Sequence, residues 1–166
     1  MTDHPYETEI TFDDKVPLVR IVREFAASPE QVFRAHADPE LFAQWVGPRN
    51  IATRIEHYDC RTGGSWRYVA VRDDETDDFT AAFHGSFHEV RPNELIVQTF
   101  TFDGMPDHVA LEKLVFERLG DDHTRLVATS LVDSFEDRDA FVATGMEEGV
   151  NEGYEQLDEL LAGQRP

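Results

Sequence analysis

Apolar and polar positions change their spacing along the chain, and each change predicts a different element. Residues 16–27, VPLVRIVREFAA, are rich in β-branched residues, which is typical of a strand. The next residues, SPEQ at 28–31, combine a capping serine, a proline for the first turn and a glutamine that completes a capping box, so they predict a helix start. The DPE at 38–40 repeats this signal for a second short helix, which Gly47 and Pro48 end.

The pattern between Ile51 and about Val132 predicts strands joined by short turns. Six runs carry this pattern: IATRIEHYD, SWRYVAVRD, FTAAFHGSFHEV, LIVQTFTF, HVALEKLVFERL and TRLVATSLV. Strands in this order with short connections form an antiparallel meander. A further short strand is expected at residues 7–12, in the polar segment that precedes the first long strand.

The last part of the chain predicts a long helix, which begins at Ser134 or Asp137 and continues to about residue 163. Glycine recurs there at Gly145, Gly149 and Gly153, although each glycine inside a helix costs roughly 0.8–1 kcal/mol relative to alanine. At 100° per residue the glycines flank an apolar stripe, so a backbone, a ring or a ligand is expected close to that flank. The stripe consists of Met146, Val150, Tyr154, Leu157 and Leu161.

Together these elements predict an α+β protein in which a curved antiparallel sheet of about seven strands is covered on one face by the long C-terminal helix. Two short helices follow the first strand. Residues 1–16 form an N-terminal extension, and residues 17–163 form a single domain of ordinary size.

Charge and cysteine content narrow the classes of partner. The chain has 34 acidic and 15 basic residues, a net charge of −19, so nucleic acid and membrane surfaces are unfavourable partners. One cysteine, Cys60, provides neither an internal disulfide nor a thiolate metal cluster. No basic start followed by an apolar core is present, and a reducing cytoplasm is the expected compartment.

Four segments, taken in order, resemble the SRPBCC superfamily of START-like and polyketide-cyclase-like proteins. They are REFAASPEQVFRAHADPELFAQWVGP (23–48), DCRTGGSWRYV (59–69), FHGSFHEVRPNELIVQTFTFDG (83–104) and ATGMEEGVNEGYEQLDELLA (143–162). The similarity extends over about residues 17–162 and is closest to homologues of the heat-shock-protein ATPase activator. The resemblance implies a helix-grip fold, in which a curved sheet grips the last helix and encloses a cavity for a hydrophobic molecule.

A cavity of this kind needs apolar walls with a few placed polar groups. Alternation along the predicted strands puts Phe83 with Phe87, and Phe100 with Phe102, on shared faces. The same rings are equally suited to a packed core, so both interpretations stay open. The predicted ligand-binding residues are Trp45, Trp66, Tyr68, Phe83, Phe87, Phe100, Phe102, Met146 and Val150.

Other candidate sites are weaker. Four residues of strand span roughly 13 Å, so His84 and His88 are too far apart to share a metal ion. The acidic run DDETDD at 73–78 lacks the ligand spacing of a calcium loop and predicts a solvated hairpin tip. Strand carboxylates such as Glu89 and Glu112 more often face solvent. We therefore expect no metal and no cofactor.

Three functions remain open at this point. The first is binding of a small hydrophobic or aromatic molecule by a monomer or homodimer. The second is catalysis of the cyclase or hydrolase kind on an aromatic or polyketide-like substrate, which requires an acid or base in the pocket, such as His84, Glu89 or Tyr68. The third, implied by the resemblance, is an interaction like that of chaperone ATPase activators.

Overall fold

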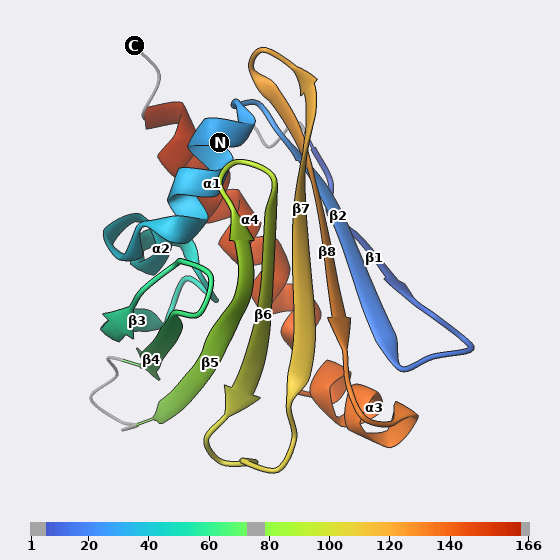
Figure 1. Ribbon diagram of the computed structural model, residues 1–166. Helices are drawn as coiled ribbons and strands as arrows, with labels where there is room; N and C mark the ends of the chain where they lie inside the picture. The colour runs from blue at the N-terminus through green and yellow to red at the C-terminus, as the bar shows by residue number, and fades with distance from the viewer. Residues whose placement is uncertain (1–5, 73–78, 164–166) are drawn as a thin grey trace.

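The computed structural model describes residues 6–72 and 79–163. Eight antiparallel strands form one curved sheet in the order β1-β2-β8-β7-β6-β5-β4-β3. The long helix α4 lies behind the sheet, against its concave face, and α1 and α2 lie beside one end of it (Figure 1). This is the α+β helix-grip arrangement that the sequence predicts.

The first half of the chain follows the predicted boundaries closely. Strand β2 (Leu18–Phe25) leads into α1 (Pro29–Ala37) and α2 (Pro39–Trp45). The capping box at Ser28 is formed, because its hydroxyl accepts the Gln31 amide and the Gln31 side chain accepts the Ser28 amide. The edge strand β1 (Glu9–Phe12) pairs with β2, so part of the predicted extension joins the sheet.

The meander has the six strands predicted between residues 51 and 132. They are β3 (Ala52–Tyr58), β4 (Ser65–Val71), β5 (Thr80–Arg91), β6 (Leu95–Phe102), β7 (Ala110–Gly120) and β8 (His123–Leu131). The pairing of β5 with β6 shifts register between Phe87 and Glu89, an irregularity that bends a strand locally. Gly85 lies just before this shift, and a Cβ there would approach the Thr99 carbonyl oxygen to 1.9 Å.

The prediction of one continuous final helix is wrong. The segment divides into α3 (Phe135–Ala143) and α4 (Met146–Gly163). Gly145 lies between them with φ of +87°, a left-handed conformation that glycine adopts readily and other residues rarely do. Gly145 is therefore the break that follows α3, and of the three evenly spaced glycines only Gly149 and Gly153 lie inside a helix.

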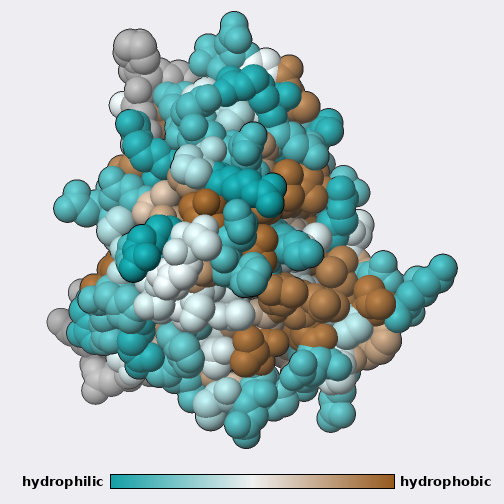
Figure 2. Space-filling model, in the orientation of Figure 1, coloured by the Kyte–Doolittle hydropathy of each residue, from teal (hydrophilic) through white to brown (hydrophobic). Residues whose placement is uncertain are grey.

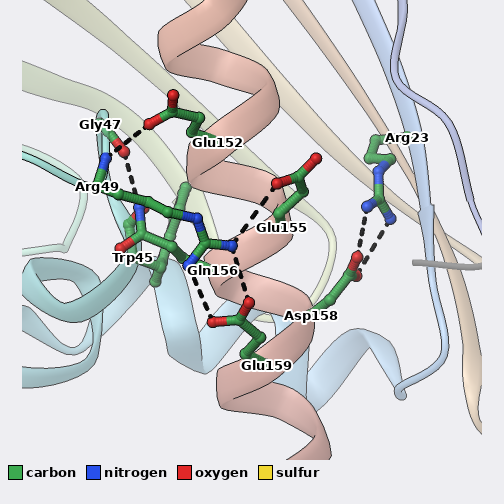
Figure 3. A network of polar contacts seen from close by, with 9 residues as sticks. All are labelled: Arg23, Trp45, Gly47, Arg49, Glu152, Glu155, Gln156, Asp158 and Glu159. Atoms are coloured by element: carbon green, nitrogen blue, oxygen red, sulfur yellow. Dashed lines mark hydrogen bonds and ion pairs between the residues drawn. The ribbon is translucent and has the colours of Figure 1, made fainter. Parts of the chain in front are cut away.

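The expected close approach occurs at Gly153. A Cβ on this residue would lie 3.2 Å from the Trp45 carbonyl oxygen and 3.4 Å from the Gly47 nitrogen, so the chain after α2 packs directly on α4. Gln156 Nε2 donates to the Gly47 carbonyl oxygen at 2.9 Å and holds this contact (Figure 3). The neighbour that the glycine admits is thus a backbone segment.

The core lies between the concave face of the sheet and α4. Buried side chains of α4 pack there against aromatic residues of β2, β4, β5 and α2. The salt bridge between Arg23 and Asp158 also joins β2 to α4 within this layer, and Arg23 is only 2% exposed. Figure 2 shows apolar surface at the lower right of the molecule. The cross-strand neighbours Leu111 and Leu131 are among the exposed large apolar side chains.

Candidate ligand-binding pocket

A pocket with a volume of about 840 Å³ opens at one end of the concave face. Four strands of the sheet, β5 to β8, form its floor, and α3, the first two turns of α4 and the loop after α2 surround its mouth. Ligand sites for small molecules usually have volumes of roughly 300–1,000 Å³, so this pocket has room for one such molecule. Residues from each of these elements line it: Phe83, Phe100, Ala110, Ser130, Phe141, Gly149 and Pro48.

The apolar wall is built mainly from phenylalanine. Phe83 lies 5.3 Å from Phe100 and 5.5 Å from Phe102, measured between ring centroids. These rings belong to neighbouring strands and face the same side, because Phe83 and Phe102 are register partners. Met105 and Val109, in the loop after β6, continue the wall to the mouth, where both side chains are more than 40% exposed.

The nine predicted ligand-binding residues separate into two groups. Phe83, Phe100 and Phe102 line the pocket. Of the others, Trp45, Trp66, Tyr68 and Phe87 are buried in the core, Val150 packs against it, and Met146 is half-buried on α4. Whether any of the nine contacts a ligand stays a prediction, but the geometry directs attention to the three phenylalanines.

Several pocket residues were not predicted from the sequence. Ala140 and Phe141 come from α3, which the sequence pattern does not separate from α4. Met105 comes from the predicted loop DGMPD, and Val109 comes from the start of the predicted strand HVALEKLVFERL, which in the structure begins at Ala110. The signal that could have found these two was the presence of apolar side chains within the polar segment DGMPDHV.

Carboxylates outnumber cations around the mouth. Four acidic residues line the pocket there, namely Asp133, Asp137, Glu148 and Glu152. His108 Nδ1 lies 3.0 Å from Asp137 Oδ2 and joins the loop after β6 to α3. The hydrogen bond to Asp137 raises the pKa of His108 above its ordinary value, and the negative charge of Asp137 adds a smaller increase.

Arg49 fixes the loop that forms one side of the mouth. Its backbone amide donates to Glu152 at 2.8 Å, and its guanidinium contacts Glu159 at 2.8 Å and Glu155 at 3.6 Å (Figure 3). The three acidic residues lie along one face of α4, so the loop is attached to the helix over two turns. Glu159 raises the pKa of Arg49, and Glu155 makes a smaller contribution in the same direction. Arg49 therefore stays positively charged.

A row of polar side chains crosses the concave face at the inner end of the pocket. Gln98 and Glu112 are register partners, and so are Glu112 and Ser130. Gln98 Nε2 donates to Glu112 Oε1 at 3.0 Å, and burial raises the pKa of Glu112. The expectation that strand carboxylates face solvent is therefore wrong for Glu112, whereas Glu89 is half-buried and pairs with Arg91.

Other candidate groups lie away from the pocket. His84 is exposed and lies 2.7 Å from Asp103, and His88 is exposed too. Burial, with a smaller contribution from Asp59, raises the pKa of Cys60 to about 11, which disfavours a reactive thiolate. Within residues 6–72 and 79–163, no group of three or more histidine, cysteine or acidic residues could hold a metal ion. The acidic run at 73–78 lies outside the described residues.

Comparison with known proteins identifies the family of this chain. The family described as "Activator of Hsp90 ATPase homolog 1-like protein" matches residues 26–162. The chain belongs to this family. None of the curated proteins compared with it matches. In the described part of the chain, no helix has the length and apolar character required to cross a membrane.

Solved structures show the same fold. A protein from Rhodobacter sphaeroides is 24% identical with a TM-score of 0.83, covering 95% of this chain and 100% of its own. A protein from Arthrobacter aurescens is also 24% identical, with a TM-score of 0.84 and coverage of 93% and 91%. A protein from Mycobacterium smegmatis is 21% identical, with a TM-score of 0.83 and coverage of 97% and 100%. At these identities the likeness concerns the fold.

Proposed function

We propose that this protein binds one small hydrophobic or aromatic molecule in the pocket between the sheet and the helices α3 and α4. The observation that supports the proposal most is a volume of about 840 Å³ walled by Phe83, Phe100 and Phe102. Apolar side chains at the mouth, such as Met105 and Val109, remain more than 40% exposed. Covering them with an apolar ligand would contribute roughly 25 cal/mol for each Å² removed from water.

The proposed site lends itself to a test by blocking its mouth. Ala140 and Ala143 are both exposed on α3, but only Ala140 lines the pocket. We expect the neutral fluorescent probe N-phenyl-1-naphthylamine to bind the wild type and Ala143→Trp, and to bind Ala140→Trp at least tenfold more weakly. Equal binding by both variants, or no binding by the wild type, would contradict the proposal. Circular dichroism of each variant would establish that it is folded.

The enzymatic alternative has less support from the geometry. His84 is exposed and Glu89 is half-buried, and their partners, Asp103 and Arg91, lie outside the pocket. Tyr68 is buried, and its burial raises its pKa well above the ordinary value, so its phenol is a poor acid or base near neutral pH. These placements favour binding over catalysis.

The family description also mentions activation of a chaperone ATPase. A pocket-centred role predicts that adding this protein leaves the ATPase rate of Hsp90 unchanged. Stimulation of that rate by both the wild type and Ala140→Trp would indicate a function that is independent of the pocket.

A further inference from the structure

The inner end of the pocket differs chemically from its aromatic wall. Phe100 on β6 and Ala110 on β7 are register partners, and both line the pocket. Two residues further along the same strands, on the same face, are Gln98 and Glu112, roughly 7 Å deeper. Ser130 on β8 completes this row and itself lines the pocket. The pocket therefore has an apolar outer part and a polar inner end.

The hydroxyl of Ser130 is the group in this row with unused hydrogen-bonding capacity. Ser130 is 7% exposed, and its Oγ is buried without a hydrogen-bond partner among the described residues. A weak hydrogen-bond interaction of this hydroxyl with Glu112 lowers the pKa of the carboxyl slightly, although burial raises it more, and the contact does not reach the geometry of a full hydrogen bond. A buried hydroxyl without a partner is unfavourable, and a ligand group that reaches it would remove that cost.

The charges around the pocket limit the kind of group that fits there. Glu112 borders the polar end, and the mouth has four carboxylates against Arg49, Arg72 and His108. Arg49 is bound by acidic residues of α4, and His108 is paired with Asp137, so neither presents an isolated positive charge. Burying an anion beside Glu112 would bring like charges together in an environment with little water.

We propose, on the basis of the binding function proposed above, that the ligand is an uncharged apolar molecule whose hydroxyl or carbonyl oxygen hydrogen-bonds with Ser130 at the inner end of the pocket. Ser130 Oγ donates to a carbonyl or accepts from a hydroxyl, and the Gln98–Glu112 pair lies beside it. The apolar body of the ligand lies against Phe83 and Phe100. Fatty acids and other carboxylates are excluded from this class.

Three probes that differ in one substituent test this inference: naphthalene, 1-naphthol and 1-naphthoate, each titrated by NMR. We expect the wild type to bind 1-naphthol about 3- to 10-fold more tightly than naphthalene, the effect of one added hydrogen bond, and to bind 1-naphthoate most weakly. In Ser130→Ala the preference for naphthol over naphthalene should disappear while naphthalene binds as before. Ser86→Ala, on the exposed side of β5, is the matched control and should keep the preference.

The outcomes separate the two proposals. If naphthalene binds but naphthol has no advantage, or if Ser130→Ala keeps that advantage, the polar-end inference is wrong and the apolar pocket stands. Tightest binding of 1-naphthoate would likewise overturn the inference. If none of the three probes binds, both the inference and the proposed binding function are overturned. Ser130→Ala should fold, because it removes a hydroxyl that makes no well-formed hydrogen bond among the described residues, and thermal unfolding would verify this.

Discussion

Glycine-to-alanine substitution at residues 145, 149 and 153 should give three different effects, although the three positions are evenly spaced. Gly145 has φ of +87° between α3 and α4. Gly149 lies in α4 with ordinary space around it, because an added Cβ would meet Pro48 at 3.6 Å. Gly153 is crowded, since an added Cβ would lie 3.2 Å from the carbonyl oxygen of Trp45.

The expected magnitudes follow from these surroundings. Gly149→Ala should stabilise the fold by up to about 1 kcal/mol, the difference in helix propensity. Gly153→Ala has the same gain, but overpacking typically costs about 1–3 kcal/mol, and the hydrogen bonds from Gln156 hold the opposing backbone in place. We therefore expect a net loss of about 1 kcal/mol. Gly145→Ala should also lose about 1 kcal/mol, because alanine is strained at positive φ.

Urea unfolding followed by circular dichroism measures these differences, with the m-value as the check that the unfolded states are comparable. The decisive comparison is between Gly149→Ala and Gly153→Ala, which make the same chemical change in the same helix. Equal free energies of unfolding for these two variants would refute the close-packing argument. A stabilised Gly145→Ala would refute the assignment of Gly145 as the break between two helices.

Two further predictions concern buried ionisable side chains. Burial lowers the pKa of His36 to about 4 from its ordinary 6.5, so the unfolded chain binds a proton that the folded chain does not, and stability should fall by about 3 kcal/mol as pH drops from 6.5 to 4. The urea-measured loss over this range should be smaller in His36→Gln, and an unchanged loss would contradict the argument. Asp158→Asn should cost about 3 kcal/mol, because it leaves the buried Arg23 without its counter-charge. Glu155→Gln on the same helix should cost less than about 0.5 kcal/mol, because the Glu155 side chain is 41% exposed, and equal losses in the two variants would show that burial of the pair contributes nothing.

The order and type of the elements were predictable from the chain because local signals specify them. The capping box at Ser28 and the alternation along each strand act over a few residues, and so does the apolar stripe of α4. The break at Gly145 was missed because glycine inside a helix and glycine after its end look alike in the sequence. The difference is a backbone angle, φ of +87°, which depends on how α3 and α4 pack.

The site was only partly predictable, because its position along each strand depends on cross-strand register. Trp66 and Phe83 both come from concave-face strands, yet Trp66 is buried in the core and Phe83 lines the pocket. Glu112 had a usable signal, since it alternates with Ala110, Leu114 and Phe116 on the inward side of its own strand. No comparable signal indicated that Ser130, two strands from Gln98, would complete the row.

Helix α3 contributes Ala140 and Phe141 to the pocket, yet it has no buried residue. Substitutions in α3 therefore leave no cavity in the core. Substitution of a buried aromatic residue that packs against α4 would, by contrast, lower the free energy of unfolding. The residues that stabilise the fold and the residues of α3 that would contact a ligand therefore belong to different segments of the chain. Related proteins that bind a different ligand could thus differ in sequence in α3 while retaining the same fold.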